Sequence, residues 1–313
     1  MKYKAPYLYF SPHIETILPS LFRKVEGVEY KRERLTTPDN DFLDLDWLHD
    51  DNKKLVIVCH GLEGSSDRPY VKGMAKALHN SNFDILAWNY RGCSGEINNN
   101  LRFYHSGATD DLELVINHSI SLGYHEIFLI GFSLGGNLVL KYCGEKEENI
   151  QEQVRKVVAF SVPLDLEAGS NRIAEPSNFI YERRFLNNLI EKVKQKAAIM
   201  PDKLSTAHIK KIKTLYDFDN FYTAPIHGFK NASDYYSKCS SINYVTNIKI
   251  PTLIINAKND PFLPAKCYPA ELLSKNEMIT FEFPERGGHV GFTEFNQDRM
   301  YWSEKRALKF ILK

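Results

Sequence analysis

Glu126-Ile127-Phe128-Leu129-Ile130-Gly131-Phe132-Ser133-Leu134-Gly135-Gly136 is the stretch that decides the fold. Its first residues, Glu126–Gly131, form a nearly continuous apolar run, which is typical of a strand covered on both faces in a parallel sheet. The pattern Gly-x-Ser-x-Gly follows, and we expect a helix to begin near Gly136. In this motif the serine stands on a sharp, strained turn between strand and helix, and the glycines let the neighbouring backbone approach closely. The segment therefore predicts a serine hydroxyl held at the end of a buried strand.

Five further apolar runs and three helical stretches surround this segment. The other expected strands are Leu55–His60, Phe83–Tyr90, Val157–Ser161, Thr252–Asn256 and Met278–Phe283, and the expected helices are Tyr70–His79, Asp110–Leu122 and Gly136–Cys143. This alternation of strand and helix predicts an α/β fold with a mostly parallel, doubly wound sheet. Val28–Leu35 and Phe42–Leu48 are expected to form an antiparallel hairpin ahead of it, and Met300–Leu312 a closing helix.

About 90 residues separate the fourth of these parallel strands from the fifth, far more than a normal crossover needs. One apolar helical stripe runs from Phe185 to Ala197 and ends before Pro201. A second, over Ile209, Ile212 and Leu215, has Ser205 as its expected N-cap. We expect one domain over residues 1–313 with a helical insertion at about 165–245. The insertion either caps a binding crevice or thickens the core.

The bulk composition is that of an ordinary globular chain, with 43% hydrophobic and 25% charged residues and a net charge of +1. That balance does not indicate a nucleic-acid partner or an acidic membrane surface. The five cysteines are scattered and never spaced as CxxC, which argues against a disulfide framework or a structural zinc site. We find no signal segment and no membrane span, so the cytoplasm is the expected location. Phosphate-loop, dinucleotide and HExxH motifs are also missing, and we expect neither a metal nor another cofactor.

Acyl transfer at a serine needs a base within reach of the hydroxyl. Of the ten histidines, only His289 follows the last predicted strand, in a glycine-rich loop that could bring its ring over Ser133. The acid that orients this histidine is expected after the fifth parallel strand, at Asp260. Asp165, after the preceding strand, is the alternative, although an aspartate at such a strand end is commonly a helix cap. Ser133, Asp260 and His289 follow the order of nucleophile, acid and base found in α/β-hydrolases.

The oxyanion formed during acyl transfer needs backbone N–H donors. The first is expected from Leu134, directly after the serine, and the second from Leu62 in the loop after the first parallel strand. His60, in the same loop, is interpreted as a structural hydrogen-bonding residue. Cys93 follows the second parallel strand and is expected to line the rim of the sheet, with Arg91 tying down loops.

These residues together resemble the YheT-like branch of the α/β-hydrolases. The branch includes bacterial proteins assigned as esterases, eukaryotic lipid hydrolases and yeast medium-chain alcohol acyltransferases. The resemblance spans nearly the whole chain and is carried by several blocks: His60–Ser66, Asn89–Cys93, Tyr104–Gly107, Gly131–Asn137, Thr223–Pro225, Asp234–Tyr236 and Gly287–Phe292. It implies Ser133, Asp260 and His289 as the triad, and esterase activity on short- to medium-chain acyl esters. The N-terminal segment Ser11–Ile17 departs from the Gly-His-Leu-Gln-Thr pattern expected for the branch.

Three functions fit these residues. The first is a carboxylesterase acting on a small-molecule or lipid ester through an acyl-enzyme on Ser133. The second is an alcohol O-acyltransferase or thioesterase with the same triad, which differs in whether water or another acceptor takes the acyl group. The third is a catalytically silent hydrolase fold used for binding, and the presence of all three triad candidates argues against it. The sequence does not determine the oligomeric state.

Overall fold

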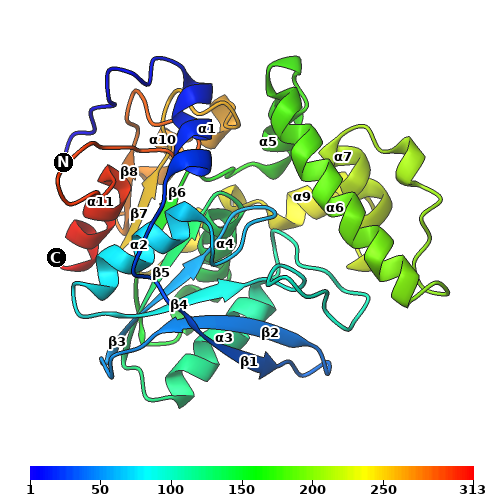
Figure 1. Cartoon of the computed structure of the whole chain (residues 1–313), viewed down its shortest axis with the longest axis horizontal. Coiled ribbons are helices and arrows are strands. Elements are labelled where there is room, and N and C mark those ends of the chain that lie inside the picture. Colours follow the sequence, from blue (N-terminus) through cyan, green and yellow to red (C-terminus); the bar gives the residue numbers. More distant parts are fainter.

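The computed structural model describes residues 1–313 and contains an eight-stranded sheet in the order β1-β2-β4-β3-β5-β6-β7-β8 (Figure 1). The strands are β1 (Lys31–Thr36), β2 (Phe42–Leu48), β3 (Lys54–Cys59), β4 (Asp84–Asn89), β5 (Glu126–Phe132), β6 (Val154–Phe160), β7 (Thr252–Ile255) and β8 (Ile279–Glu282). β2 pairs antiparallel with both β1 and β4, and the other neighbours are parallel. The predicted α/β class and mostly parallel sheet are confirmed.

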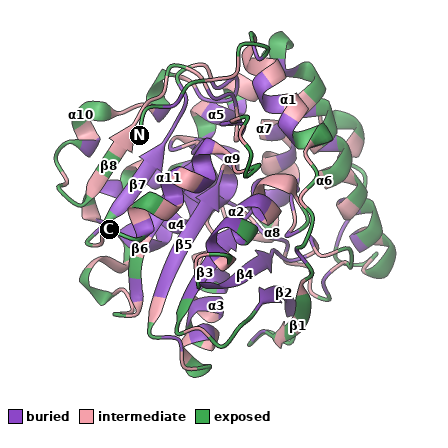
Figure 2. Cartoon of the chain, turned by 60° about the vertical axis from the view of Figure 1, so that its left-hand side comes forward, coloured by how far each residue is buried: buried purple, intermediate pink, exposed green.

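Helices cover both faces of the sheet. They are α1 (Pro12–Phe22), α2 (Pro69–His79), α3 (Thr109–Ser121), α4 (Leu134–Lys146), α5 (Leu166–Ile173), α6 (Phe179–Ile199), α7 (Leu215–Phe218), α8 (Ala224–Ile226), α9 (Ala232–Cys239), α10 (Ala270–Leu273) and α11 (Trp302–Ile311). Alternate residues of β3 point to opposite faces: Leu55 and Ile57 pack with α3 and α4, whereas Val56 and Val58 pack with α2 and α11. The inner strands are therefore buried on both sides, as Figure 2 shows for β3 to β7.

Most element boundaries lie within three residues of those expected from the sequence. The hairpin begins at Lys31 rather than Val28, because Val28 packs into the core before β1 starts to pair. The helix after the serine motif begins at Leu134, two residues earlier than predicted, so Ser133 itself is its N-cap residue.

The strand order places the serine motif beside the loop that follows β3. β4 lies on one side of β3 and β5 on the other, so the direction in which the sheet grows reverses at β3. In open α/β sheets, ligands bind outside the carboxyl ends of the strands at such a reversal point. The loop that holds Leu62 and the turn that holds Ser133 follow neighbouring parallel strands and meet there.

The long insertion forms helices α5 to α9, which lie to the right of the sheet in Figure 1. α6 ends at Ile199, just before Pro201, as predicted. The predicted second helix with Ser205 as its N-cap is wrong. The Ser205 hydroxyl only accepts a bond from the nearby Ala207 N–H, and the short helix α7 is instead capped by Thr214, which forms a capping box with Asp217.

All five cysteines are buried and unpaired. None of the helices combines the length and the apolar character that crossing a membrane would require.

Candidate active site

Ser133 occupies a strained turn between β5 and α4. Its φ of 54° and ψ of −118° lie outside the regions that an L-residue normally adopts. The turn is held by the Ser133 N–H, which donates to the Phe160 carbonyl at 2.8 Å. A Cβ on Gly131 would lie 2.3 Å from the Gly135 oxygen, and one on Gly135 would lie 2.3 Å from the Cys59 oxygen. Both glycines of the motif are therefore required by close backbone packing.

The structure brings Ser133, His289 and Asp260 together in one chain of hydrogen bonds. His289 lies in the loop after β8, and its Nε2 is 2.9 Å from the Ser133 Oγ. Its Nδ1 is 2.9 Å from Oδ2 of Asp260, which lies in the loop after β7 and is buried. The Phe262 ring packs on the imidazole at 4.3 Å, and the Phe262 N–H donates to Asp260 Oδ1. In this arrangement the imidazole can accept the serine proton while the carboxylate fixes its tautomer.

Asp165, the alternative acid, lies elsewhere. It is the N-cap residue of α5, and its Oδ1 accepts the Ala168 N–H at 2.9 Å. No hydrogen bond joins it to His289, so the position of its carboxylate is that of a helix cap.

Two tyrosines hold the backbone on either side of Leu62. The Gly61 N–H donates to the Tyr70 hydroxyl, and the Glu63 N–H donates to the Tyr104 hydroxyl, both at 2.9 Å. The N–H of Leu62, between them, has no acceptor in the protein. Leu134 is the first residue of α4, and the first N–H groups of a helix lack an intrahelical partner. The two backbone donors expected for an oxyanion thus flank Ser133, and the sequence did not reveal the two tyrosines.

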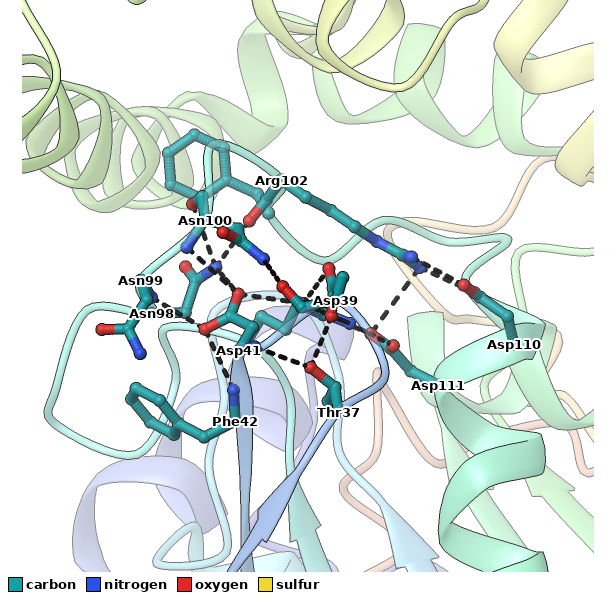
Figure 3. Close-up of polar contacts among 12 residues, drawn as sticks. Thr37, Asp39, Asp41, Phe42, Asn98, Asn99, Asn100, Arg102, Asp110 and Asp111 are labelled. Atoms are coloured by element: carbon teal, nitrogen blue, oxygen red, sulfur yellow. Dashed lines mark hydrogen bonds and ion pairs between the residues drawn. The ribbon is translucent and has the colours of Figure 1, made fainter.

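A buried polar cluster anchors the loop that carries Tyr104 (Figure 3). Arg91, which is 2% exposed, donates both to Asp111 and to Asp41 of the β1–β2 connection. Asp41 also accepts from the Asn98 side chain at 2.6 Å and from the Asn99 N–H at 2.8 Å. The predicted role of Arg91 in tying down loops is therefore confirmed, and the loop it anchors leads directly into the site.

His60 and Cys93 have the environments of structural residues. Burial lowers the pKa of His60 to about 3, and its Nδ1 lies 2.8 Å from the Gly61 carbonyl, to which it donates. Burial likewise raises the pKa of Cys93 to about 11, although Lys192 lies 3.2 Å from its sulfur. A thiol with so high a pKa is a poor nucleophile near neutral pH.

The family model described as the alpha/beta hydrolase fold matches residues 54–295. The chain is an α/β hydrolase. It is 36% identical over 287 residues to the YheT protein of Escherichia coli (strain K12), whose name assigns it provisionally as an esterase. That match covers 90% of this chain and 84% of the relative. The resemblance to the YheT-like branch is thereby confirmed.

A second relative of the hydrolase is the medium-chain fatty acid ethyl ester synthase/esterase 2 of Saccharomyces cerevisiae, at 27% identity over 86% of this chain and 64% of that protein. Among solved structures, the Pyrococcus furiosus esterase Pf2001 superposes with a TM-score of 0.59 at 18% identity, covering 91% of this chain and 93% of that one. That likeness concerns the fold. The hydrolase is of the esterase and lipase type, the type to which these relatives and the monoacylglycerol lipase of Saccharomyces cerevisiae belong.

Two pockets of the hydrolase meet at Ser133. The first, here called the apolar pocket, is lined mainly by the insertion, with Leu166, Phe185 and Phe218 among its walls. The second, here called the histidine pocket, contains His289 and residues of α1 such as Ile17. Four residues line both pockets: Leu62, Ser133, Phe185 and Phe262. A substrate bound across Ser133 can therefore place one part in each pocket.

Helix α1 holds the histidine loop in place, a contact that the sequence did not reveal. The carboxylate of Glu15, which is 1% exposed, accepts from the Gly287 N–H, the Arg286 Nε and the Asn259 side chain at 2.7–2.8 Å. The Thr16 hydroxyl accepts the His289 N–H at 2.9 Å. The only sequence signal for this contact was the Gly-His-Leu-Gln-Thr pattern of the branch. Glu15 and Thr16 occupy its last two positions, and the glutamate in place of glutamine at the fourth position concealed the match.

Replacing Glu15 with glutamine is expected to lower the free energy of unfolding by about 2 kcal/mol, because the amide cannot accept bonds from all three donors and leaves a buried partner unpaired. The esterase kcat/KM should fall as well, since the His289 loop loses its anchor. Urea unfolding and steady-state kinetics measure the two effects.

Glu294→Gln is the matched control for this variant. Glu294 pairs with Lys305 near the surface, and its replacement should change stability by less than about 0.5 kcal/mol. Equal stabilities of the two variants would contradict the anchoring role of Glu15.

Proposed function

We propose that this hydrolase is a serine carboxylesterase that works through an acyl-enzyme on Ser133. The observation that carries the proposal is the chain of hydrogen bonds from Ser133 through His289 to Asp260, at the junction of two pockets. Ser133 Oγ attacks the ester carbonyl carbon while His289 Nε2 takes the hydroxyl proton. The carboxylate of Asp260 stabilises the imidazolium that forms.

The N–H groups of Leu62 and Leu134 stabilise the negative charge that develops on the carbonyl oxygen. The tetrahedral intermediate collapses when the C–O bond to the alcohol breaks, and His289 returns its proton to the departing alcohol oxygen. A water molecule then attacks the acyl-enzyme, with His289 again as the base, and releases the carboxylic acid.

The positions of the two pockets support a proposal for where the two halves of the ester bind. The leaving alcohol must reach His289 to receive a proton, and His289 lines the histidine pocket but not the apolar pocket. The alcohol therefore occupies the histidine pocket and the acyl chain occupies the apolar pocket. In this proposal the insertion at about 165–245 is a cap on a single domain spanning 1–313, because α5, α6 and α7 each supply apolar side chains to the pocket lining: Leu166, Ile173, Phe185, Leu189, Leu215 and Phe218. An apolar pocket that begins at the nucleophile and is bounded by the cap suits short- to medium-chain acyl groups.

A series of p-nitrophenyl esters graded by acyl length tests this assignment. We expect kcat/KM to rise to a maximum at short to medium chains and to fall for long ones, because the apolar lining of the pocket has a limited extent. Absence of turnover across the series, with folded protein, would refute the proposal.

Acyl transfer to an alcohol is the second candidate. It is favoured by the relative named as an ethyl ester synthase and esterase, and by the apolar side chains Ile17, Leu21 and Ile180 on the alcohol side of the site. The ratio of ethyl hexanoate to hexanoic acid, formed from p-nitrophenyl hexanoate with added ethanol, separates transfer from hydrolysis.

A further inference from the structure

A carboxylate without a basic partner lies in the lining of the apolar pocket. Asp219 begins a π-helical turn, Asp219–Thr223, that directly follows α7. π-Helical turns are rare and frequently occur at functional sites. The same pocket is lined by Ser133, so a molecule that reaches Ser133 through this pocket shares the space with Asp219.

Two hydroxyl groups, but no cation, contact this carboxylate. The Thr223 hydroxyl donates to its Oδ1 at 2.5 Å, and the Tyr236 hydroxyl of α9 donates to its Oδ2 at 2.6 Å. No lysine, arginine or histidine forms an ion pair with it. Burial raises the pKa of Asp219 to about 6, an effect that the two hydrogen bonds oppose.

Such a group costs folding free energy, because a charge removed from water without an opposite charge is poorly compensated. An ionised carboxylate offers about four lone-pair sites, and Thr223 and Tyr236 use two of them. The neighbouring walls of the pocket, Phe218 and Tyr222, are largely apolar. A ligand group that donates a hydrogen bond to Asp219 would therefore compensate the carboxylate charge, which the apolar walls do not.

We propose that Asp219 is a specificity residue that binds a hydrogen-bond donor, a hydroxyl or an ammonium group, on the acyl chain of the substrate. This inference rests on the proposed function, since it takes the apolar pocket as the acyl site. Asp219 makes no bond to the reacting atoms. Its effect is on which acyl chain is accepted.

Four ethyl esters test the proposal: hexanoate, β-hydroxyhexanoate, ω-hydroxyhexanoate and ω-aminohexanoate. Wild type is expected to favour at least one donor-bearing ester over hexanoate by about tenfold in kcat/KM, the size of a hydrogen bond to a charged group. Asp219→Asn should reduce that ratio about tenfold, because the amide is a weaker acceptor. Comparison of the two hydroxy esters with the amino ester shows whether a hydroxyl or an ammonium group is recognised.

Asp217→Asn is the matched control. Asp217 lies two residues earlier and caps α7, but it does not line the pocket, so its replacement should leave the ratio unchanged. Equal kcat/KM for all four esters in wild type, or an unchanged ratio in Asp219→Asn, would overturn the proposal.

Binding without turnover separates this inference from the proposed function. In Ser133→Ala, calorimetry should show tighter binding of the favoured donor-bearing ester than of ethyl hexanoate, and the added Asp219→Asn substitution should remove the difference. Absence of hydrolysis by the wild type, with the binding preference intact, would count against the esterase mechanism, whereas equal binding of the two esters would count against Asp219.

The thermal stability of Asp219→Asn provides a readout that does not depend on substrate. Because the folded-state pKa is raised above the ordinary value of 3.8, the folded protein binds this proton more tightly than the unfolded chain does. Its contribution to stability is present below about pH 4 and is lost as pH rises through about 6. Tyr235, Tyr236 and Cys239 of α9 lie near Asp219, and burial raises the pKa of all three. His105 and His227 line the same pocket, and burial lowers the pKa of both. At pH 7.5 the Tm of Asp219→Asn should therefore exceed that of wild type by roughly 3 °C. A lower Tm would contradict the uncompensated charge.

Discussion

Ser133→Ala is expected to lower kcat/KM for p-nitrophenyl hexanoate by at least about 10⁴-fold while leaving the protein folded. Removing the nucleophile of a serine triad typically costs about as much as removing the whole triad, and the oxyanion donors alone retain only a small residual rate. The substitution deletes one oxygen from a partly exposed position and leaves the glycines that shape the turn. Steady-state kinetics with active-site titration measure the effect, and circular dichroism verifies the fold.

Cys93→Ala is the comparison for this variant, because Cys93 is a second nucleophilic side chain in a loop at this edge of the sheet. It is buried and its thiol pKa is raised, so its removal should change kcat/KM by less than about threefold. If Cys93→Ala removed the activity and Ser133→Ala retained it, the mechanism would be wrong.

Asp260→Asn is the second large effect, an expected fall in kcat of about 10⁴-fold. The asparagine keeps the size of the side chain, but its amide stabilises the wrong tautomer of His289, and Nε2 then holds a proton where it must accept one. The substrate KM should change little, because Asp260 lines neither pocket.

Asp165→Asn distinguishes the two aspartates that the sequence left as candidates for the acid. Asp165 caps α5, so its replacement should cost less than about 1 kcal/mol of stability, because asparagine is also a good N-cap residue, and should retain most of the activity. Similar losses of kcat in the two variants would argue against Asp260 as the orienting acid.

Much of the fold and of the candidate site could be predicted because the relevant signals are local. The apolar runs of β3, β5 and β6 are continuous over most of each strand. Ser133 directly follows β5, and Asp260 and His289 lie in the loops that follow β7 and β8. Since parallel strands end at one edge of the sheet, side chains far apart in sequence were expected to meet there.

The features that were missed depend on contacts between distant segments. Glu15 anchors a loop more than 270 residues away, and nothing in the local pattern of α1 indicates that partner. The hydroxyls of Tyr70 and Tyr104 hold the Leu62 loop from two different connections. The error at Ser205 has a different cause: Ser205 and Thr214 are both acceptable N-caps by residue type, and the capping box with Asp217 decides for Thr214.

The most direct test of the central claim is to identify the residue that a fluorophosphonate probe modifies. The purified protein is incubated with the probe, digested and sequenced by tandem mass spectrometry, with Ser133→Ala treated in parallel. The mechanism predicts one stoichiometric adduct on Ser133 in wild type and none in Ser133→Ala. Equal labelling of the two proteins, or an adduct on another residue, would show that Ser133 is not the nucleophile.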